Sequence, residues 1–190
     1  MIKIPIAPKP ENPVMIDRAL AYIQDSLISK IGWLNHAFGR SQKLVTQRDR
    51  SQYYYPAVYI GNNEYINVLP GQELGNRTFF QVDDPHDIEY IPRMYNLIKS
   101  PVSLICWYNL TDIYQHTKER NTEDVKRQLL RVFANLTMPN GTRMELAKIY
   151  EQPENIFKGY SLREIDTQYL MNPYAGLRIE GYLTYREECI

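Results

Sequence analysis

The chain has 190 residues, of which 44% are hydrophobic, and a formal net charge of zero from 22 basic and 22 acidic side chains. This length suits one domain with its own core. The balanced charge does not favour binding to nucleic acid or to an anionic membrane by bulk attraction. We expect neither a transmembrane helix nor a signal peptide, because the sequence lacks the apolar runs that each requires.

The first 11 residues carry three prolines and therefore predict an extended arm rather than a helix. Ile2, Ile4 and Ile6 alternate along this arm. Such an arm either packs on its own domain or crosses to a neighbouring copy. Residues 12–190 are expected to form a single domain.

Asn12-Pro13 is typical of a helix cap followed by a proline in the first turn. Apolar residues then recur at three- and four-residue steps from Ile16 to Leu34. This spacing predicts an amphipathic helix of about six turns. Residues 40–50, which carry four basic side chains and one acidic one, are predicted to be a solvated loop. Contact with DNA or with an acidic partner is the alternative.

Strand patterns follow. The segments rich in aromatic and β-branched residues are 53–60, 65–69, 77–82, 88–91 and 101–111. Residues 61–64 (GNNE) between the first two are typical of a tight hairpin turn. The segment at 101–111 is apolar on both faces, so we place it in the middle of a sheet.

Asn121 predicts the cap of a second helix, whose apolar stripe ends near Leu136. Residues 144–150 fit a strand or a short helix, and residues 153–158 fit one helical turn. The last segment alternates over about a dozen residues from Tyr174 to Arg186. This period of two predicts one long strand with partners, in a central or near-central position.

The order of elements predicts an α+β fold, with a mostly antiparallel sheet and two main helices packed on one face. The other face would meet solvent or a partner. The chain has 16 tyrosines against five phenylalanines. Tyrosine is enriched at protein interfaces and also at half-buried strand positions, so both interpretations remain open.

No nucleotide-binding, serine-hydrolase, zinc-protease or CxxC motif is present. We therefore expect no enzyme activity, cofactor or metal. The acidic segment at residues 83–89 contains the one candidate for such chemistry, around Asp84, His86 and Asp87. Oxygen ligands in a loop can hold a hard cation, but the spacing fits no EF-hand loop and the segment contains Pro85, so a solvated acidic turn is the favoured interpretation.

The element order and the closing segment NPYAGLRIEGYLTYREEC at 172–189 resemble the tail-terminator and neck (head–tail connector) proteins of tailed bacteriophages. The resemblance extends to the ring proteins below the portal in crAss-like phages. It covers nearly the whole chain in element order and implies a tail-terminator-like fold. The arm and the 70–100 region depart from the pattern.

The resemblance implies a structural protein of the virion, made in the host cytoplasm, that forms a ring of six or twelve copies. Its partners would be itself, the portal or adaptor rings and the tail proteins, with non-specific DNA contact in the lumen and no membrane. The 40–52 and 70–100 loops would contact adjacent rings or line the channel. The predicted subunit-interface residues are Ile2, Ile4, Ile6, Tyr53, Tyr54, Tyr55, Tyr174 and Tyr182. A monomeric adaptor or ligand-binding domain and, less favoured, a small enzyme remain alternatives.

Overall fold

The computed structural model describes residues 4–48, 50–92, 94–115 and 121–188. The strands are β1 (His36–Arg48), β2 (Ser51–Gly61), β3 (Glu64–Asn67), β4 (Arg77–Val82), β5 (Asp87–Ile91), β6 (Tyr95–Asn109), β7 (Arg143–Tyr150) and β8 (Tyr174–Glu188). The helices are α1 (Met15–Lys30), α2 (Leu110–Ile113), α3 (Thr122–Ala134) and α4 (Pro153–Ile156). Single 3-10 turns are η1 (Gln72–Leu74), η2 (Leu162–Glu164) and η3 (Thr167–Leu170).

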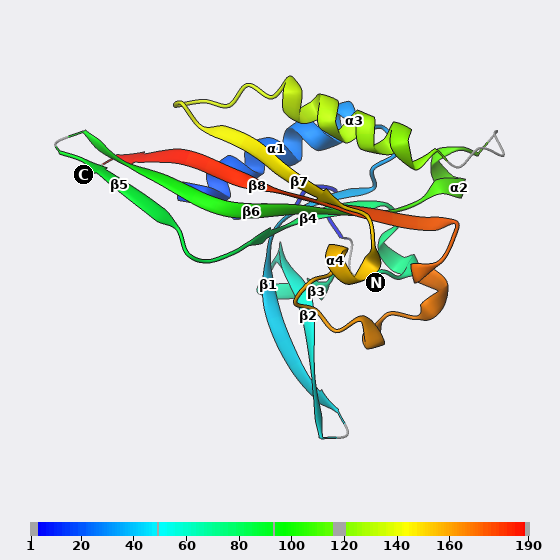
Figure 1. Cartoon of the computed structure of the whole chain (residues 1–190). Coiled ribbons are helices and arrows are strands. Elements are labelled where there is room, and N and C mark those ends of the chain that lie inside the picture. The colour runs from blue at the N-terminus through cyan, green and yellow to red at the C-terminus, as the bar shows by residue number, and fades with distance from the viewer. Residues whose placement is uncertain (1–3, 49, 93, 116–120, 189–190) are drawn as a thin grey trace.

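The strands form one eight-stranded sheet in the order β3-β2-β1-β4-β6-β8-β7, and β5 pairs with β6 outside this path. β1 and β4 run parallel, whereas the other pairs are antiparallel. α1 and α3 both lie on one face of the sheet (Figure 1). The predicted α+β class, with two main helices on one face of a mostly antiparallel sheet, is confirmed.

The closing strand β8 has a partner on both edges, as its length and alternation predict. It pairs with β6 along its whole length, from Asn109↔Tyr174 to Tyr95↔Glu188. Its other edge pairs with β7. The odd-numbered residues Leu177, Ile179 and Leu183 point to the helix side and are buried there.

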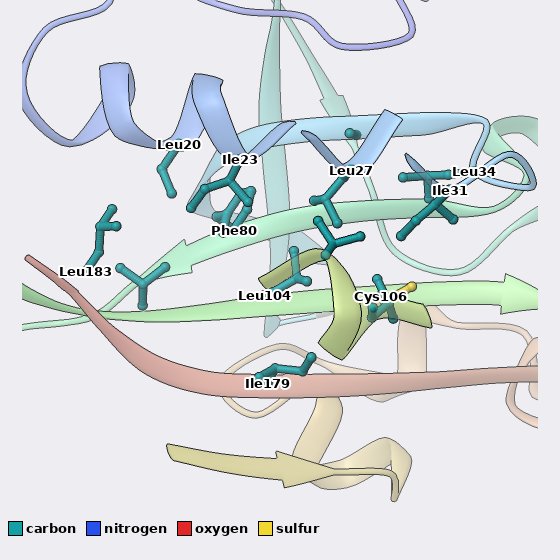
Figure 2. Packing of buried hydrophobic residues seen from close by; sticks show 14 of the residues in the cluster. Leu20, Ile23, Leu27, Ile31, Leu34, Phe80, Leu104, Cys106, Ile179 and Leu183 are labelled. Atoms are coloured by element: carbon teal, nitrogen blue, oxygen red, sulfur yellow. The ribbon is translucent and has the colours of Figure 1, made fainter. Parts of the chain in front are cut away.

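The main core lies between the two helices and the sheet. Figure 2 shows side chains of α1 pointing at side chains of β4, β6 and β8. The labelled residues are Leu20, Ile23 and Leu27 of α1, Ile31 and Leu34 just after it, Phe80 of β4, Leu104 and Cys106 of β6, and Ile179 and Leu183 of β8. α3 adds Val125, Leu129 and Val132 to the same core. Each fully buried aliphatic side chain of this kind stabilises the fold by about 1.5–3 kcal/mol.

The ends of α1 and the start of α3 show which local sequence signals predict a helix boundary correctly. The Oδ1 atom of Asn121 accepts a hydrogen bond from the Asp124 amide at 3.0 Å, so the predicted cap of α3 is confirmed. The predicted cap of α1 at Asn12 is wrong, because the cap residue is Val14 and it makes no side-chain bond. The helix ends at Lys30, four residues before Leu34, since Ile31 has extended backbone angles.

The predicted loop at residues 40–50 is also wrong, because most of it belongs to β1. Backbone pairing with β2 runs from Ser41↔Val58 to Arg48↔Ser51 and makes a long hairpin. β1 leaves β4 after the pair Arg40↔Phe80, and the hairpin then projects away from the sheet (Figure 1). Such a ribbon carries little apolar alternation, because both of its faces meet solvent over much of its length. The next turn is as predicted, with positive φ at Asn62 (52°) and Asn63 (60°).

The opposite face of the sheet is covered by the chain itself over part of its area. A second core joins β2, β4 and β6 to the segment between β7 and β8. Its buried members include Phe38, Phe79, Ile105, Trp107 and Phe157. The expectation that this whole face meets solvent or a partner is therefore wrong for this part. No helix among the described residues is long and apolar enough to cross a membrane.

Candidate functional site

The described part of the arm packs on its own domain. The Ala37 amide donates to the Ile6 carbonyl at 2.9 Å, and the His36 Nδ1 atom lies 2.9 Å from the Pro5 carbonyl oxygen. Ile4 is half-buried against the second core, whereas Ile6 is 59% exposed. Ile2 lies outside the described residues. Of the two described isoleucines, Ile6 is the exposed one, and its role at an interface stays a prediction.

The predicted interface tyrosines do not form one patch. Tyr53, Tyr54 and Tyr55 lie on β2 in the projecting hairpin, where Tyr54 is exposed and the Lys43 ammonium lies 4.5 Å from its ring centroid. Tyr174 begins β8 and packs on Tyr169 near the second core. Tyr182 lies eight residues further along the strand, about 26 Å away. Their role as interface residues stays a prediction.

The acidic segment brings three groups into a line that resembles a hydrolase triad. His86 Nδ1 lies 2.8 Å from Ser100 Oγ, and its Nε2 lies 3.5 Å from Asp84 Oδ1. However, Ser100 is fully buried, whereas the Asp84 side chain is 95% exposed. A serine with no access to solvent cannot attack a substrate, so this geometry does not support a hydrolase.

Asp87 is exposed at the start of β5 and does not join that line. Within the described ranges, no group of three or more His, Cys, Asp or Glu side chains is placed to hold a metal ion. Burial raises the pKa of the Cys106 thiol, which keeps it protonated at neutral pH. Cys106 is therefore a core residue of the helix side.

A cleft of about 510 Å³ lies between the arm, α1 and the bend of β1. Burial raises the pKa of Asp17 at its wall, and the Arg40 guanidinium opposes this shift. The Gln24 amide donates to the carbonyls of Pro8 (3.0 Å) and Ala37 (2.8 Å), so its donors are already used. The cleft thus holds charged groups but no convergent set of acid, base and nucleophile.

β5 is an edge strand with an exposed apolar face. In the described part of the chain it pairs with β6 and has no strand on its other edge. Ile88 and Tyr90 are 67% and 65% exposed, and they alternate with the acidic Asp87 and Glu89. Side chains at alternate positions point to opposite faces. β5 is therefore apolar on one face and acidic on the other.

The opposite edge of the sheet, β7, differs from β5. Its register with β8 shifts between Leu146 and Lys148. An irregular, charged edge resists pairing with another strand, whereas a regular edge accepts it. β5 keeps a continuous register with β6 from Asp87↔Lys99 to Ile91↔Tyr95. β5 is consequently the better acceptor for a further strand.

The projecting hairpin has the opposite charge. Residues 40–50 contain four basic residues and one acidic residue, a net charge of +3. Residues 83–89 contain four acidic residues and a histidine, a net charge of −4 with the histidine neutral. Figure 1 shows the β1–β2 hairpin pointing down and the β5–β6 hairpin pointing to the left. The alternation in DIEYI at 87–91 was the available sequence signal for the apolar face of β5.

No protein-family model matches the chain, and no curated protein matches it at a significant level.

Proposed function

We propose that the chain is a ring-forming subunit of the neck or tail-completion region of a tailed bacteriophage. There it would join the portal to the tail and help to form the conduit for DNA. The resemblance supports this function through its order of an N-terminal helix, β-hairpins, a second helix on the sheet and closing strands. The observation that carries the proposal is that one subunit offers two different, oppositely charged surfaces that point in different directions.

Two different surfaces suit a head-to-tail ring. In a closed ring each subunit uses one patch toward one neighbour and a second patch toward the next. A two-fold dimer would instead use one self-complementary surface, so both patches of a subunit would have to meet the same partner, which patches that point in different directions do not favour. Because the hairpin has a net charge of +3 and the acidic segment one of −4, self-contact of either patch is repulsive. Opposite charges therefore favour a ring, and we propose six or twelve copies.

In such a ring the partners along the axis would be the portal or adaptor rings on one side and tail proteins on the other. The protein would belong to the virion after assembly in the host cytoplasm. DNA would pass through the lumen and make at most non-specific contacts with it, since the balanced charge of the chain offers no bulk attraction.

The location of the protein tests this function. Gold-labelled antibodies against the chain would be applied to purified virions from the phage or prophage that encodes it. We expect label at the junction between head and tail, seen by electron microscopy. Label confined to the capsid surface or the tail tip, or absence of the protein from virions, would contradict the proposal.

A further inference from the structure

We propose that the β1–β2 hairpin of one copy docks along β5 of the next copy, and that this contact joins neighbouring subunits. The inference rests on the proposed ring function and deepens it by naming the two surfaces that meet. The occupant of the open β5 edge is thus a defined segment of a second copy, residues 41–54.

β5 supplies the acceptor. A strand with one unpaired edge presents free backbone N–H and C=O groups that another extended segment can bind. An added strand would also cover the exposed side chains of Ile88 and Tyr90 on one face, and would lie beside Asp87 and Glu89 on the other. β5 carries charges on one face, as free edge strands ordinarily do, but its other face exposes Ile88 and Tyr90, and exposed apolar side chains are unusual on an edge without a partner.

The hairpin supplies a complementary segment. From Ser41 onward, β1 pairs with β2 and, among the described residues, has no strand on its other edge. Val45 is 54% exposed and lies directly opposite the exposed Tyr54, which gives the hairpin an apolar pair of its own. Lys43 and Arg50 are exposed as well. The paired region spans about 26 Å, which exceeds the length of β5.

The two segments do not meet within one chain. β1 separates from β4 after Arg40, while β5 continues along the edge of β6 in another direction (Figure 1). Among the described residues, no ion pair joins residues 40–50 to residues 83–89. Asp83 is paired with Arg178 inside the chain, whereas no ion pair among the described residues engages Asp87 or Glu89 on β5, or Lys43 or Arg50 on the hairpin. These side chains therefore remain available to neighbouring copies, and attraction between them also favours one orientation of encounter.

Charge reversal tests the contact. The hairpin variant is Lys43→Glu with Arg50→Glu, and the strand variant is Asp87→Lys with Glu89→Lys. All four side chains are exposed, so each variant should keep the fold, which circular dichroism would check. We expect each variant alone to self-associate roughly tenfold or more weakly than the unaltered protein. Residues 40–50 change from +3 to −1 and then face the acidic β5, whereas β5 itself (residues 87–91) changes from −2 to +2 and then faces the basic hairpin.

Mixing the two variants in equal amounts should restore assembly. In an alternating ring the acidic hairpin of one variant meets the basic strand of the other, and the two remaining surfaces keep their natural charges. A matched control is Lys148→Glu with Arg131→Glu, two exposed side chains on β7 and α3, away from both segments, and it should assemble normally. Normal assembly of both reversal variants, or failure of the mixture to recover, would overturn the inference.

A photo-crosslink tests the same contact between copies in the case that complete rings form only on the portal. The photoreactive residue p-benzoylphenylalanine would replace Tyr90, and isotope-labelled and unlabelled chains would be mixed to identify intermolecular products. We expect crosslinks to residues 41–54 of another copy. The same residue at Tyr22, exposed on α1, is the control and should not react there. Crosslinks to other segments, or none, would overturn the inference.

The two proposals can fail separately. Normal ring formation by both reversal variants would rule out the docking contact but would not contradict the ring function. A crosslink from position 90 to the hairpin of another copy, together with absence of the protein from virions, would keep the contact and remove the neck function.

Discussion

The two faces of the sheet are covered by different means. On the helix side, α1 and α3 bury regularly spaced apolar side chains against β4, β6 and β8. On the opposite side, irregular segments and the hairpin cover only part of the sheet and enclose two buried cations, Arg77 and Arg178. The helix face is thus stabilised by apolar burial, whereas the opposite face also depends on how well its buried charges are satisfied.

Both buried arginines are fully engaged. Arg77 donates to the carbonyls of Val68 at 3.0 Å and Gly75 at 2.7 Å, and also to that of Leu69. Burial lowers its pKa to about 10, so it stays protonated at neutral pH. Arg178 bonds with Glu180 at 3.1 Å and Asp83 at 3.4 Å. The bonds from Arg77 hold the segment between β3 and β4 against the sheet, and the bond from Arg178 holds Asp83 after β4. Neither segment has a periodic apolar pattern.

The largest expected loss in the free energy of unfolding comes from a substitution on the face opposite the helices. Arg77→Met should lower the free energy of unfolding by about 3–5 kcal/mol, because buried carbonyls lose their donors. Urea denaturation would measure it. Arg77→Lys keeps the charge and part of the donation, so it should cost less. A neutral effect of Arg77→Met would show that the loops on this face are held by apolar contacts alone.

On the helix face we expect a somewhat smaller loss. Leu27→Ala removes a fully buried side chain of α1 and should cost about 3 kcal/mol through lost burial and the cavity left behind. Ser29→Ala, two positions away on the exposed side of the same helix, should change stability by less than about 0.5 kcal/mol. Equal effects of the two substitutions in urea denaturation would contradict the account of this core.

The smallest expected effect is on the pH dependence of stability, through His36 where the arm meets β1. Burial is the main cause that lowers the pKa of His36, and Arg77 adds to it, while the bond to Pro5 opposes it. A histidine with a lowered pKa contributes stability above its unfolded value of about 6.5 and loses it as pH falls through the folded value.

The unaltered protein should therefore lose more stability between pH 7.5 and pH 5.5 than His36→Gln does. Urea denaturation at the two pH values would show it. An identical pH dependence in both proteins would mean that His36 is not held neutral by the fold.

The contrast between the faces also explains what the sequence could predict. Asn121 and the apolar spacing behind it located α3, and the alternation from Tyr174 onward located β8 and its buried face. Such signals exist because one regular element faces one apolar layer. Residues 40–50 carry no such apolar periodicity, since the hairpin is held by backbone pairing and meets solvent along much of its length.

The candidate surfaces were harder to predict than the fold. Tyrosine content pointed to an interface, but Tyr54, Tyr174 and Tyr182 lie in three separate places. The composition of the acidic segment indicates possible catalysis, whereas nothing local in the sequence shows that its apolar neighbours Ile88 and Tyr90 are exposed. Exposure of a strand edge depends on which strands pair, and this is a long-range property that local pattern does not contain.

The central claim is that one subunit meets the next through two different surfaces and that the chain of contacts closes. Light scattering on the purified protein over a range of concentrations tests it most directly. The account predicts a discrete species at six or twelve times the subunit mass of 22.4 kDa. A limiting dimer that never grows would contradict it, because both surfaces would then be used within one pair of subunits and none would remain for a third.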